Sequence, residues 1–236
     1  MQQLCKAFEQ LNITVNNETF TKFEKYMQLV LRWNEKVNLT AITNEDDFIK
    51  KHFIDSILCA GFDEFKNAET VIDVGTGAGF PGVPLALMFP VKQFLLIDSV
   101  GKKIKILGEI LVELEISNVT LLHCRAEELA HKSEYRENFD ICVSRAVANL
   151  AALSEYCLPF VRLGGNFIAY KGSDAAEELA GAEGAIKILG GGIAEIKKAE
   201  LENFNFDHNF VIIKKKQGTP EKYPRKTGTP AKKPLK

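Results

Sequence analysis

A glycine-rich turn in the first half of the chain has the residue types of a nucleotide-binding loop. It reads Asp73-Val74-Gly75-Thr76-Gly77-Ala78-Gly79-Phe80-Pro81-Gly82 and follows a short apolar run. Glycine permits positive φ angles and lets a ligand approach the backbone closely, and the first turn of a following helix offers unpaired N–H groups. The turn therefore predicts a nucleotide site that includes Gly75, Gly77 and Gly79.

The turn fits either a nicotinamide dinucleotide or another adenine-containing cofactor that carries an amino group. The spacing Gly77-x-Gly79-x-x-Gly82, with Asp98 at the end of the next apolar run, matches the fingerprint of a nicotinamide-dependent oxidoreductase. Asp73 argues against an oxidoreductase. A carboxylate at this position can bind a cofactor's amino group or orient the loop, but a protein that binds a pyrophosphate gains little from it. A simpler role, in which Asp73 only caps the loop, remains open. A second acid, Glu127, follows the third predicted strand, where an adenine edge would lie.

The surrounding pattern predicts the sheet that positions these residues. Short apolar runs, typical of buried strands, cover residues 70–75, 93–99, 119–125, 139–145, 165–171, 192–201 and 209–215. Helical patterns fill residues 82–89, 101–115, 149–158 and 174–189, which are plausible crossover lengths. The last two strands lack a long helix between them and suggest an antiparallel hairpin at the edge. We expect Asp73, Asp98 and Glu127 to meet at the carboxyl edge of this α/β sheet.

The segment before the sheet predicts a small helical cap. Apolar residues recur at three- and four-residue steps from Phe20 to Leu31, and a second helix is expected from the capping pattern Thr43-Asn44-Glu45-Asp46 to near Gly61. We expect three regions: a cap over 1–65, a core over 66–216 and a basic, flexible tail over 217–236. On the second helix, His52, Asp55 and Ser56 share one face and point either into the cleft or into helix packing.

Charge is distributed unevenly along the chain. The net charge is −1, but residues 214–236 hold nine Lys or Arg and one Glu, a net charge of +8, which leaves −9 for residues 1–213. Such a tail suits a polyphosphate partner or is a solvated, disordered end. The four histidines and five cysteines lack metal-ligand spacing, so we expect no metal. The absence of a long apolar run or secretory signal favours a cytoplasmic protein without membrane partners.

Longer stretches narrow the comparison to one family. They are RWNEKVNLTAI (32–42), HFIDS (52–56), residues 73–84, residues 96–103, Ser144-Arg145-Ala146, Tyr170-Lys171-Gly172 and residues 219–235. Together they resemble the class I methyltransferases called RsmG or GidB, the rRNA small subunit methyltransferase G family, over almost the whole chain. The resemblance implies a Rossmann-like, seven-stranded, mostly parallel sheet with helices on both faces and an N-terminal helical cap.

The resemblance also implies a cofactor and a substrate. The cofactor would be S-adenosyl-L-methionine, and the substrate would be N7 of a guanine in 16S rRNA, guanine 527 in the family. We expect a monomer that binds 16S rRNA or the small ribosomal subunit. The residues carried over by position are Gly75, Phe80, Asp98, Ala126, Glu127 and Arg145, and together with Asp73, Gly77, Gly79 and Ser99 they make up the expected cofactor site.

Guanine N7 has an in-plane lone pair, so its methylation needs no general base and depends on positioning. Arg145 and Lys171 end adjacent predicted strands and are the candidates for positioning the guanine. The candidate RNA contacts are Asn38, His52, Lys214, Lys215, Lys216, Lys222, Tyr223, Arg225 and Lys226. Three alternatives remain: a methyltransferase for a small molecule or protein, a nicotinamide-dependent oxidoreductase, and a non-enzymatic RNA-binding accessory.

Overall fold

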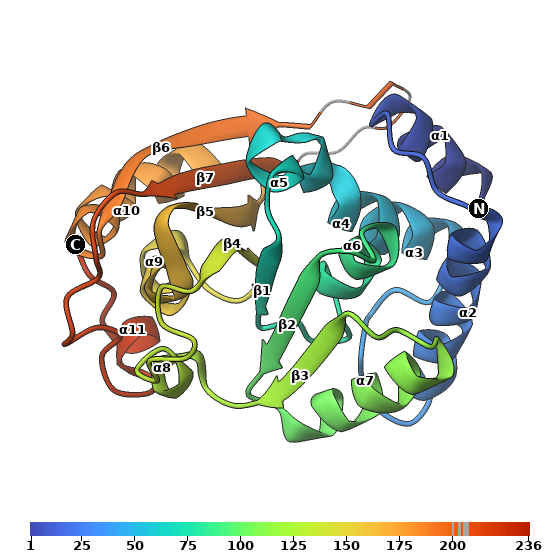
Figure 1. Cartoon of the computed structure of the whole chain (residues 1–236), viewed down its shortest axis with the longest axis horizontal. Helices are drawn as coiled ribbons and strands as arrows, with labels where there is room; N and C mark the ends of the chain where they lie inside the picture. Colours follow the sequence, from blue (N-terminus) through green and yellow to red (C-terminus); the bar gives the residue numbers. More distant parts are fainter. Residues whose placement is uncertain (200, 203, 205–207) are drawn as a thin grey trace.

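A seven-stranded sheet forms the centre of the computed structural model, which describes residues 1–199, 201, 202, 204 and 208–236. Its spatial order is β3-β2-β1-β4-β5-β7-β6 (Figure 1). The strands are β1 (Thr70–Val74), β2 (Gln93–Asp98), β3 (Val119–His123), β4 (Phe139–Arg145), β5 (Val161–Lys171), β6 (Gly191–Lys198) and β7 (Asn209–Lys215). β7 runs antiparallel to both of its neighbours, and the other adjacent pairs are parallel.

The predicted strands are confirmed, with small changes at their ends. β5 begins four residues earlier than expected, and the run predicted over 192–201 forms β6 only as far as Lys198. Position 200 lies outside the described residues. The antiparallel hairpin at the edge is confirmed too, and β7 inserts between β5 and β6, so β6 is the outermost strand.

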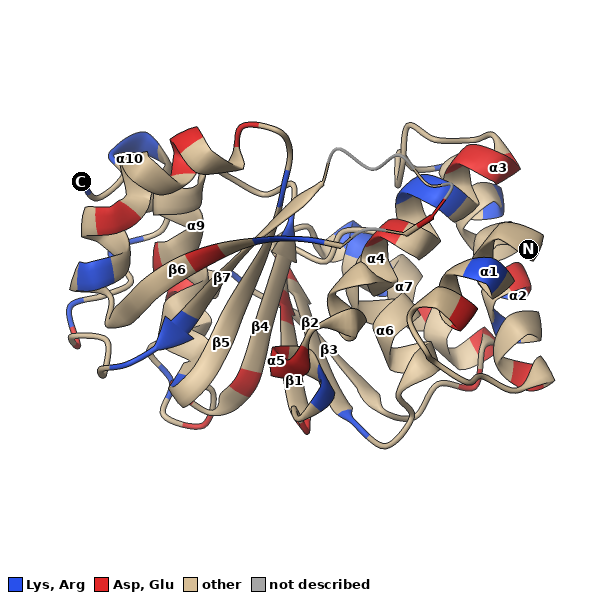
Figure 2. Cartoon of the chain, turned by 90° about the horizontal axis from the view of Figure 1, so that it is seen from above, with Lys and Arg blue, Asp and Glu red and all other residues tan. Residues whose placement is uncertain are grey.

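Alternating side chains of the strands pack into two apolar layers, one on each face of the sheet. Val71 and Leu96 face one cluster of buried residues, whereas Ile72 and Leu95 face the other. Successive side chains of a strand point to opposite faces, so a continuous apolar run covers both. α6 (Gly82–Met88) and α7 (Gly101–Glu113) pack on the first face. α8 (Ala126–Leu129), α9 (Leu150–Cys157), the 3-10 turn η3 (Leu158–Phe160) and α10 (Ala175–Ile188) pack on the second, and Figure 2 shows the sheet between the two groups.

The N-terminal cap joins the apolar layer of α6 and α7. Its elements are α1 (Gln2–Gln10), α2 (Asn17–Asn34), α3 (Glu45–Phe48), the π-helix η1 (Ile49–Ile54), α4 (Asp55–Ile57), the 3-10 turn η2 (Leu58–Gly61) and α5 (Asp63–Lys66). Asn16 begins α2 by accepting a 2.8 Å hydrogen bond from the Thr19 backbone N–H, and the apolar stripe of α2 is buried as predicted. Cap and core therefore share one hydrophobic cluster.

The second predicted helix of the cap is divided into several pieces. Asn44, rather than Thr43, is the N-cap, because its side chain accepts a 3.1 Å hydrogen bond from the Asp47 backbone N–H. After α3 the helix changes to the wider π-helical form in η1 and then continues as α4. π-Helical turns are rare and often occur at functional sites. No helix among the described residues is long and apolar enough to cross a membrane.

The basic tail packs against the core, which corrects the expectation of a flexible end. Arg225 forms a two-pronged ion pair with the fully buried Glu155 of α9, with Nε–Oε1 and Nη2–Oε2 distances of 2.9 and 2.6 Å. Arg136 donates to the backbone carbonyls of Thr219 and Tyr223. The tail ends with α11 (Thr229–Lys232), which lies beside α8 in Figure 1. Composition alone suggested a solvated segment because it does not show which acids pair with these cations.

Candidate active site

The glycine turn adopts backbone conformations that favour glycine. Gly75, Gly77 and Gly79 have φ angles of 78°, 61° and 102°. A Cβ atom on Gly75 would lie 2.4 Å from a methyl carbon of Val147, and one on Gly79 would lie 2.5 Å from the hydroxyl of Tyr26. A Cβ atom on Gly77 would meet nothing within 4 Å, so this residue faces open space. The first and third glycines thus allow close packing, and Gly77 presents its backbone to the pocket.

Asp73 lies wholly buried beneath the turn and orients it. Its Oδ2 atom accepts hydrogen bonds from the Thr76 hydroxyl at 2.7 Å and from the Gly82 backbone N–H at 2.9 Å. Oδ1 is buried without a hydrogen-bond partner among the described residues. Burial raises the pKa of Asp73 to about 7. The loop-orienting role predicted for Asp73 is therefore present, and one acceptor atom remains unsatisfied.

Asp98 closes the turn from the end of β2. Its Oδ2 atom accepts a 2.9 Å hydrogen bond from the Gly77 backbone N–H, and its Oδ1 atom accepts one of 2.8 Å from Val100. A carboxylate oxygen has two lone pairs, so each oxygen keeps one for a further donor such as a ribose hydroxyl. The β1–β2 register brings these two strand ends together, because Val74 pairs with Ile97.

A pocket of about 380 Å³ opens at this edge of the sheet. Six of the predicted cofactor residues line it: Gly75, Gly77, Asp98, Ser99, Ala126 and Glu127. Glu127 is buried in α8, and its Oε1 atom accepts a 2.9 Å hydrogen bond from Gly228 of the tail. Tyr156 and Ala231 also line the pocket, and no spacing in the sequence pointed to either residue.

Phe80 and Arg145 are outside the wall of this pocket, and their contacts with the cofactor stay predictions. Phe80 is buried among the aromatic rings of the cap, and its ring stacks on that of His52 with 4.4 Å between centroids. Arg145 lines a neighbouring cavity. Gly79 and Asp73 are also outside the pocket wall. Gly79 lets Tyr26 approach the turn, and Asp73 lies buried beneath the turn.

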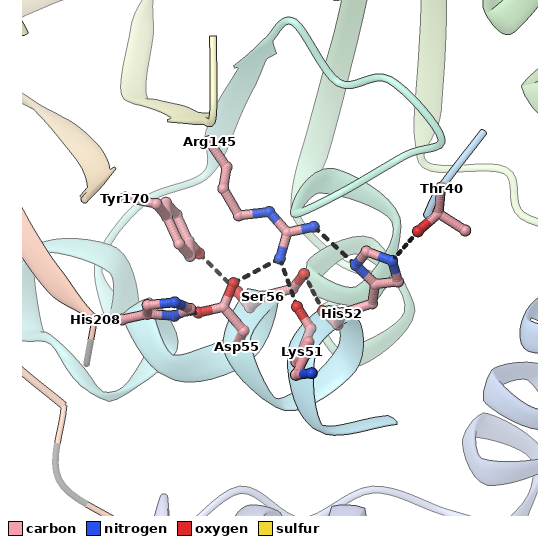
Figure 3. A network of polar contacts seen from close by, with 8 residues as sticks. All are labelled: Thr40, Lys51, His52, Asp55, Ser56, Arg145, Tyr170 and His208. Atoms are coloured by element: carbon pink, nitrogen blue, oxygen red, sulfur yellow. Dashed lines mark hydrogen bonds and ion pairs between the residues drawn. The ribbon is translucent and has the colours of Figure 1, made fainter. Parts of the chain in front are cut away.

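Arg145 occupies the centre of a polar network between the sheet and the cap (Figure 3). Its Nη1 atom donates to Asp55 Oδ2 at 2.6 Å and to the Lys51 carbonyl at 3.1 Å. Its Nη2 atom lies 3.3 Å from His52 Nδ1. Asp55 is almost completely buried, and its other oxygen contacts His208. The cap therefore fixes the guanidinium at the carboxyl end of β4.

His52 supports the arginine as a neutral ring. Burial, and then the positive charge of Arg145, lowers the pKa of His52 to about 4. In the neutral ring Nδ1 accepts from Arg145, and Nε2, which lies 2.6 Å from Thr40 Oγ1, carries the proton. Both ring nitrogens of His52 are thus engaged within the protein, and its role as an RNA contact stays a prediction.

A second cavity, of about 860 Å³, lies beside the cofactor pocket. Its wall includes Arg145, His52, Asp55 and Lys171, and it shares residues 146–148 with the pocket. Lys171 donates to Glu178 Oε2 at 2.8 Å and to the Ala148 carbonyl at 2.9 Å. The segment 146–148 is therefore the boundary between the two cavities, and Lys171 holds it in place.

The other predicted contacts separate into inward-facing and exposed residues. Ser56 is buried behind the site and donates to the His52 carbonyl. Lys215 is wholly buried with its Nζ atom 2.7 Å from the Leu158 carbonyl, Tyr223 is buried, and Arg225 is paired with Glu155. Lys215, Tyr223 and Arg225 thus have partners within the protein, and their roles as RNA contacts stay predictions. The exposed candidates are Asn38, Lys214, Lys216, Lys222 and Lys226.

Comparisons with solved structures show which class has this fold. An O-methyltransferase family protein from Burkholderia thailandensis superposes with a TM-score of 0.54 at 10% identity, covering 70% of this chain and 56% of that chain. A ribosomal protein L11 methylase from Lactobacillus delbrueckii subsp. bulgaricus gives a TM-score of 0.51 at 19% identity, covering 71% and 79%. The fold is that of the class I methyltransferases, which use S-adenosyl-L-methionine.

Sequence relatives identify the family within that class. Residues 19–206 match the GidB family, rRNA small subunit methyltransferase G, and the chain belongs to it. A ribosomal RNA small subunit methyltransferase G from Clostridium tetani is 49% identical over 233 residues, 99% of this chain and 98% of that protein. The protein of the same name from Clostridium kluyveri is 48% identical over 236 residues, 100% of this chain and 98% of its own length. The resemblance inferred from the sequence is confirmed.

The residues of the pocket fit S-adenosyl-L-methionine. The cofactor carries positive charge on its sulfonium and amino groups, and the buried carboxylates at this edge are Asp73, Asp98 and Glu127. A pyrophosphate would be repelled by the same carboxylates. Asp73 Oδ1 lacks a described partner, and the two Asp98 oxygens have lone pairs to spare. Within the part of the chain that the structure describes, no cluster of three or more potential ligands could hold a metal ion.

Proposed function

We propose that this chain transfers a methyl group from S-adenosyl-L-methionine to N7 of a guanine in 16S rRNA. Membership of the rRNA small subunit methyltransferase G family supports an rRNA acceptor. The observation that carries the proposal is the second cavity, because it meets the cofactor pocket along residues 146–148 and has Arg145 in its wall. An acceptor in this cavity would therefore lie next to the transferable methyl group.

Arg145 has hydrogen-bond donors left for the guanine. A guanidinium has five N–H groups, and within the described residues three of them donate to Lys51, Asp55 and His52. The two that remain suit acceptor atoms such as guanine O6 or a phosphate oxygen. Because the cap holds the guanidinium on one side, these donors are oriented before the substrate arrives.

Two of the three carboxylates that line the cavity within the described part of the chain are held in ion pairs, the third, Asp174, is exposed, and the proposed reaction needs no general base. Asp55 is paired with Arg145 and contacts His208, and Glu178 is paired with Lys171. The cofactor supplies an electrophilic methyl group on a sulfonium, and the N7 lone pair can attack it without losing a proton. One positive charge moves from sulfur to the methylated guanine ring, so total charge is conserved. The protein contributes positioning, which can supply several kcal/mol.

Recognition of the surrounding RNA is proposed for the exposed polar residues Asn38, Lys214, Lys216, Lys222 and Lys226. Lysines neutralise phosphates without reading sequence, and the guanine must leave its stack to enter the cavity. We further propose that the chain acts as a monomer in the cytoplasm and that the small ribosomal subunit or its RNA is the partner.

A transfer assay tests the proposed reaction. Undermethylated small subunits and their naked 16S rRNA are incubated separately with radiolabelled S-adenosyl-L-methionine, and the product is digested to nucleosides. Label in 7-methylguanosine at one position is the expected result. Label in another nucleoside, or in ribosomal protein, would overturn the assignment of N7. Label in neither, with the cofactor still bound, would exclude the ribosomal acceptor.

A further inference from the structure

The C-terminal tail extends to the cofactor pocket. Gly228 donates its backbone N–H to Glu127 Oε1 at 2.9 Å, and Thr227 donates its hydroxyl to Glu128 Oε1 at 3.2 Å. Three residues further on, Ala231 lines the pocket that also contains Gly77 and Asp98. The tail thus contributes directly to the wall formed by α8.

Several contacts hold the tail in this position. Arg225 is locked on the buried Glu155, and the carbonyl of Pro224 lies 2.8 Å from His131 Nε2. Pro230 is buried at the start of α11. Tyr156 of α9 lines the same pocket as Ala231. The segment 227–232 is therefore built into the pocket from two sides, by α8 and by α9.

We infer that residues 227–232 are a cofactor-binding element that forms the outer wall of the pocket and orients Glu127 toward the ligand. The inference rests on the proposed placement of the cofactor beside Gly77, Asp98 and Glu127. With Glu127 Oε1 bonded to Gly228, Oε2 is the oxygen left to accept from a ligand amino group. The basic tail then has a role in holding the small cofactor, separate from any contact with RNA.

This arrangement couples tail docking to cofactor binding. A ligand that touches both α8 and the docked segment binds the docked state more tightly than the undocked state. By linkage, the factor by which docking strengthens ligand binding is also the factor by which bound ligand strengthens docking. Loss of the docked state therefore lowers the ligand affinity, and bound ligand protects the segment. The coupling gives two independent readouts, an affinity and a local protection.

A matched pair of glycine substitutions tests the affinity. Gly228 has φ +77° and Gly164 has φ +80°, and a Cβ atom on either would meet nothing within 4 Å. Alanine at each position therefore introduces the same backbone strain without a clash, but Gly164 lies on β5 outside the pocket. We expect Gly228→Ala to weaken S-adenosylhomocysteine binding about tenfold by calorimetry, and Gly164→Ala to leave it unchanged. Equal affinities for the two variants would overturn the inference.

Hydrogen exchange of the full-length protein with and without S-adenosylhomocysteine tests the protection. We expect slower exchange in peptides covering residues 73–82 and in those covering 227–232. Protection of 73–82 alone would keep the cofactor site but overturn the role of the tail. Binding without protection of 73–82 would overturn the placement of the cofactor itself, and with it this inference. Lack of any binding would overturn both.

Discussion

The guanidinium of Arg145, at the carboxyl end of β4, donates a 2.6 Å hydrogen bond to the carboxylate of Asp55 in the cap. The Arg145 side chain is 16% exposed and that of Asp55 is 1% exposed, so water screens this pair weakly. The contact joins residues 90 positions apart and connects the helical cap to the carboxyl edge of the sheet. The cap and the sheet therefore meet at the candidate active site.

Replacing Asp55 by asparagine tests the strength of this connection. Asp55→Asn keeps the side-chain shape but leaves Arg145 without its buried counter-charge, which typically costs about 3 kcal/mol. We expect a loss of that order in the free energy of unfolding, measured by urea denaturation, together with a lower methyl-transfer rate.

An exposed ion pair elsewhere in the cap sequence provides the control. Asp47 is paired with Lys51 at 3.0 Å, and both side chains are about half exposed. Asp47→Asn should change stability by less than about 0.5 kcal/mol. If both asparagine variants were as stable as the wild type, the Asp55–Arg145 pair would not connect cap and core.

The depressed pKa of His52 predicts a pH dependence of stability. Its pKa is about 4 in the fold and near 6.5 when unfolded. The unfolded chain therefore binds the proton first, and the contribution of His52 is complete above pH 6.5 and declines as the pH falls toward 4. The free energy of unfolding should fall by roughly 2 to 3 kcal/mol over this pH window, and this fall should be absent in His52→Gln.

Comparing the wild type with His52→Gln separates the contribution of His52 to the pH dependence of stability from that of other groups. Asp73 has the opposite effect, since its raised pKa of about 7 means that stability is lost as the pH rises through 7. Asp73 is present in both proteins, so its effect cancels in the difference. Identical stability curves for wild type and His52→Gln from pH 4.5 to 7 would refute the assignment of a neutral, buried His52.

Local patterns were sufficient to predict the sheet and the cofactor turn. The strand ends at Asp73 and Asp98 follow from apolar runs that end at a glycine or an acid, and both carboxylates lie at the expected edge. Gly75 and Gly77 could be predicted because their positive φ angles are a backbone requirement that the residue type itself reveals.

Contacts between distant segments could not be predicted in this way. Phe80 follows the turn directly, yet it packs under the cap because Tyr26, Phe48 and Phe53 surround it there. Lys215 and Arg225 were indistinguishable from the exposed lysines of the tail, because a basic residue shows no trace of its partner in the sequence. Their partners, Leu158 and Glu155, are 57 and 70 positions away.

Asp98 provides a direct test of the cofactor pocket. Asp98→Ala removes the acceptor for Gly77 and the lone pairs proposed for the ribose hydroxyls. Because hydrogen bonds to charged groups contribute about 1.5–3 kcal/mol each, we expect at least tenfold weaker binding of S-adenosyl-L-methionine by calorimetry. Asp63→Ala, which removes an exposed carboxylate of α5, should bind normally. Unchanged affinity in Asp98→Ala would place the ribose elsewhere.

The lysines of the tail predict how RNA binding depends on salt. Lys222 and Lys226 are exposed, whereas Lys215 is buried and bonded to the Leu158 carbonyl. If the exposed pair contacts phosphates, Lys222→Ala with Lys226→Ala should reduce the slope of log affinity against log salt by roughly 1.5, because each contact contributes about 0.7 to 0.9. Binding is measured by filter retention of 16S rRNA over a roughly fourfold range of salt concentration, from about 50 to about 200 mM.

Lys215→Met is the matched substitution at a buried lysine. It removes one positive charge from the same tail, but its effect should fall on folding, because the Leu158 carbonyl loses a donor in the protein interior. We expect a lower melting temperature with an unchanged salt slope. A reduced slope in Lys215→Met, or an unchanged slope in the double variant, would show that charge in the tail acts on RNA without regard to exposure or does not act at all. The first result would make exposure irrelevant to the contribution of a lysine, and the second would remove Lys222 and Lys226 from the RNA interface proposed here.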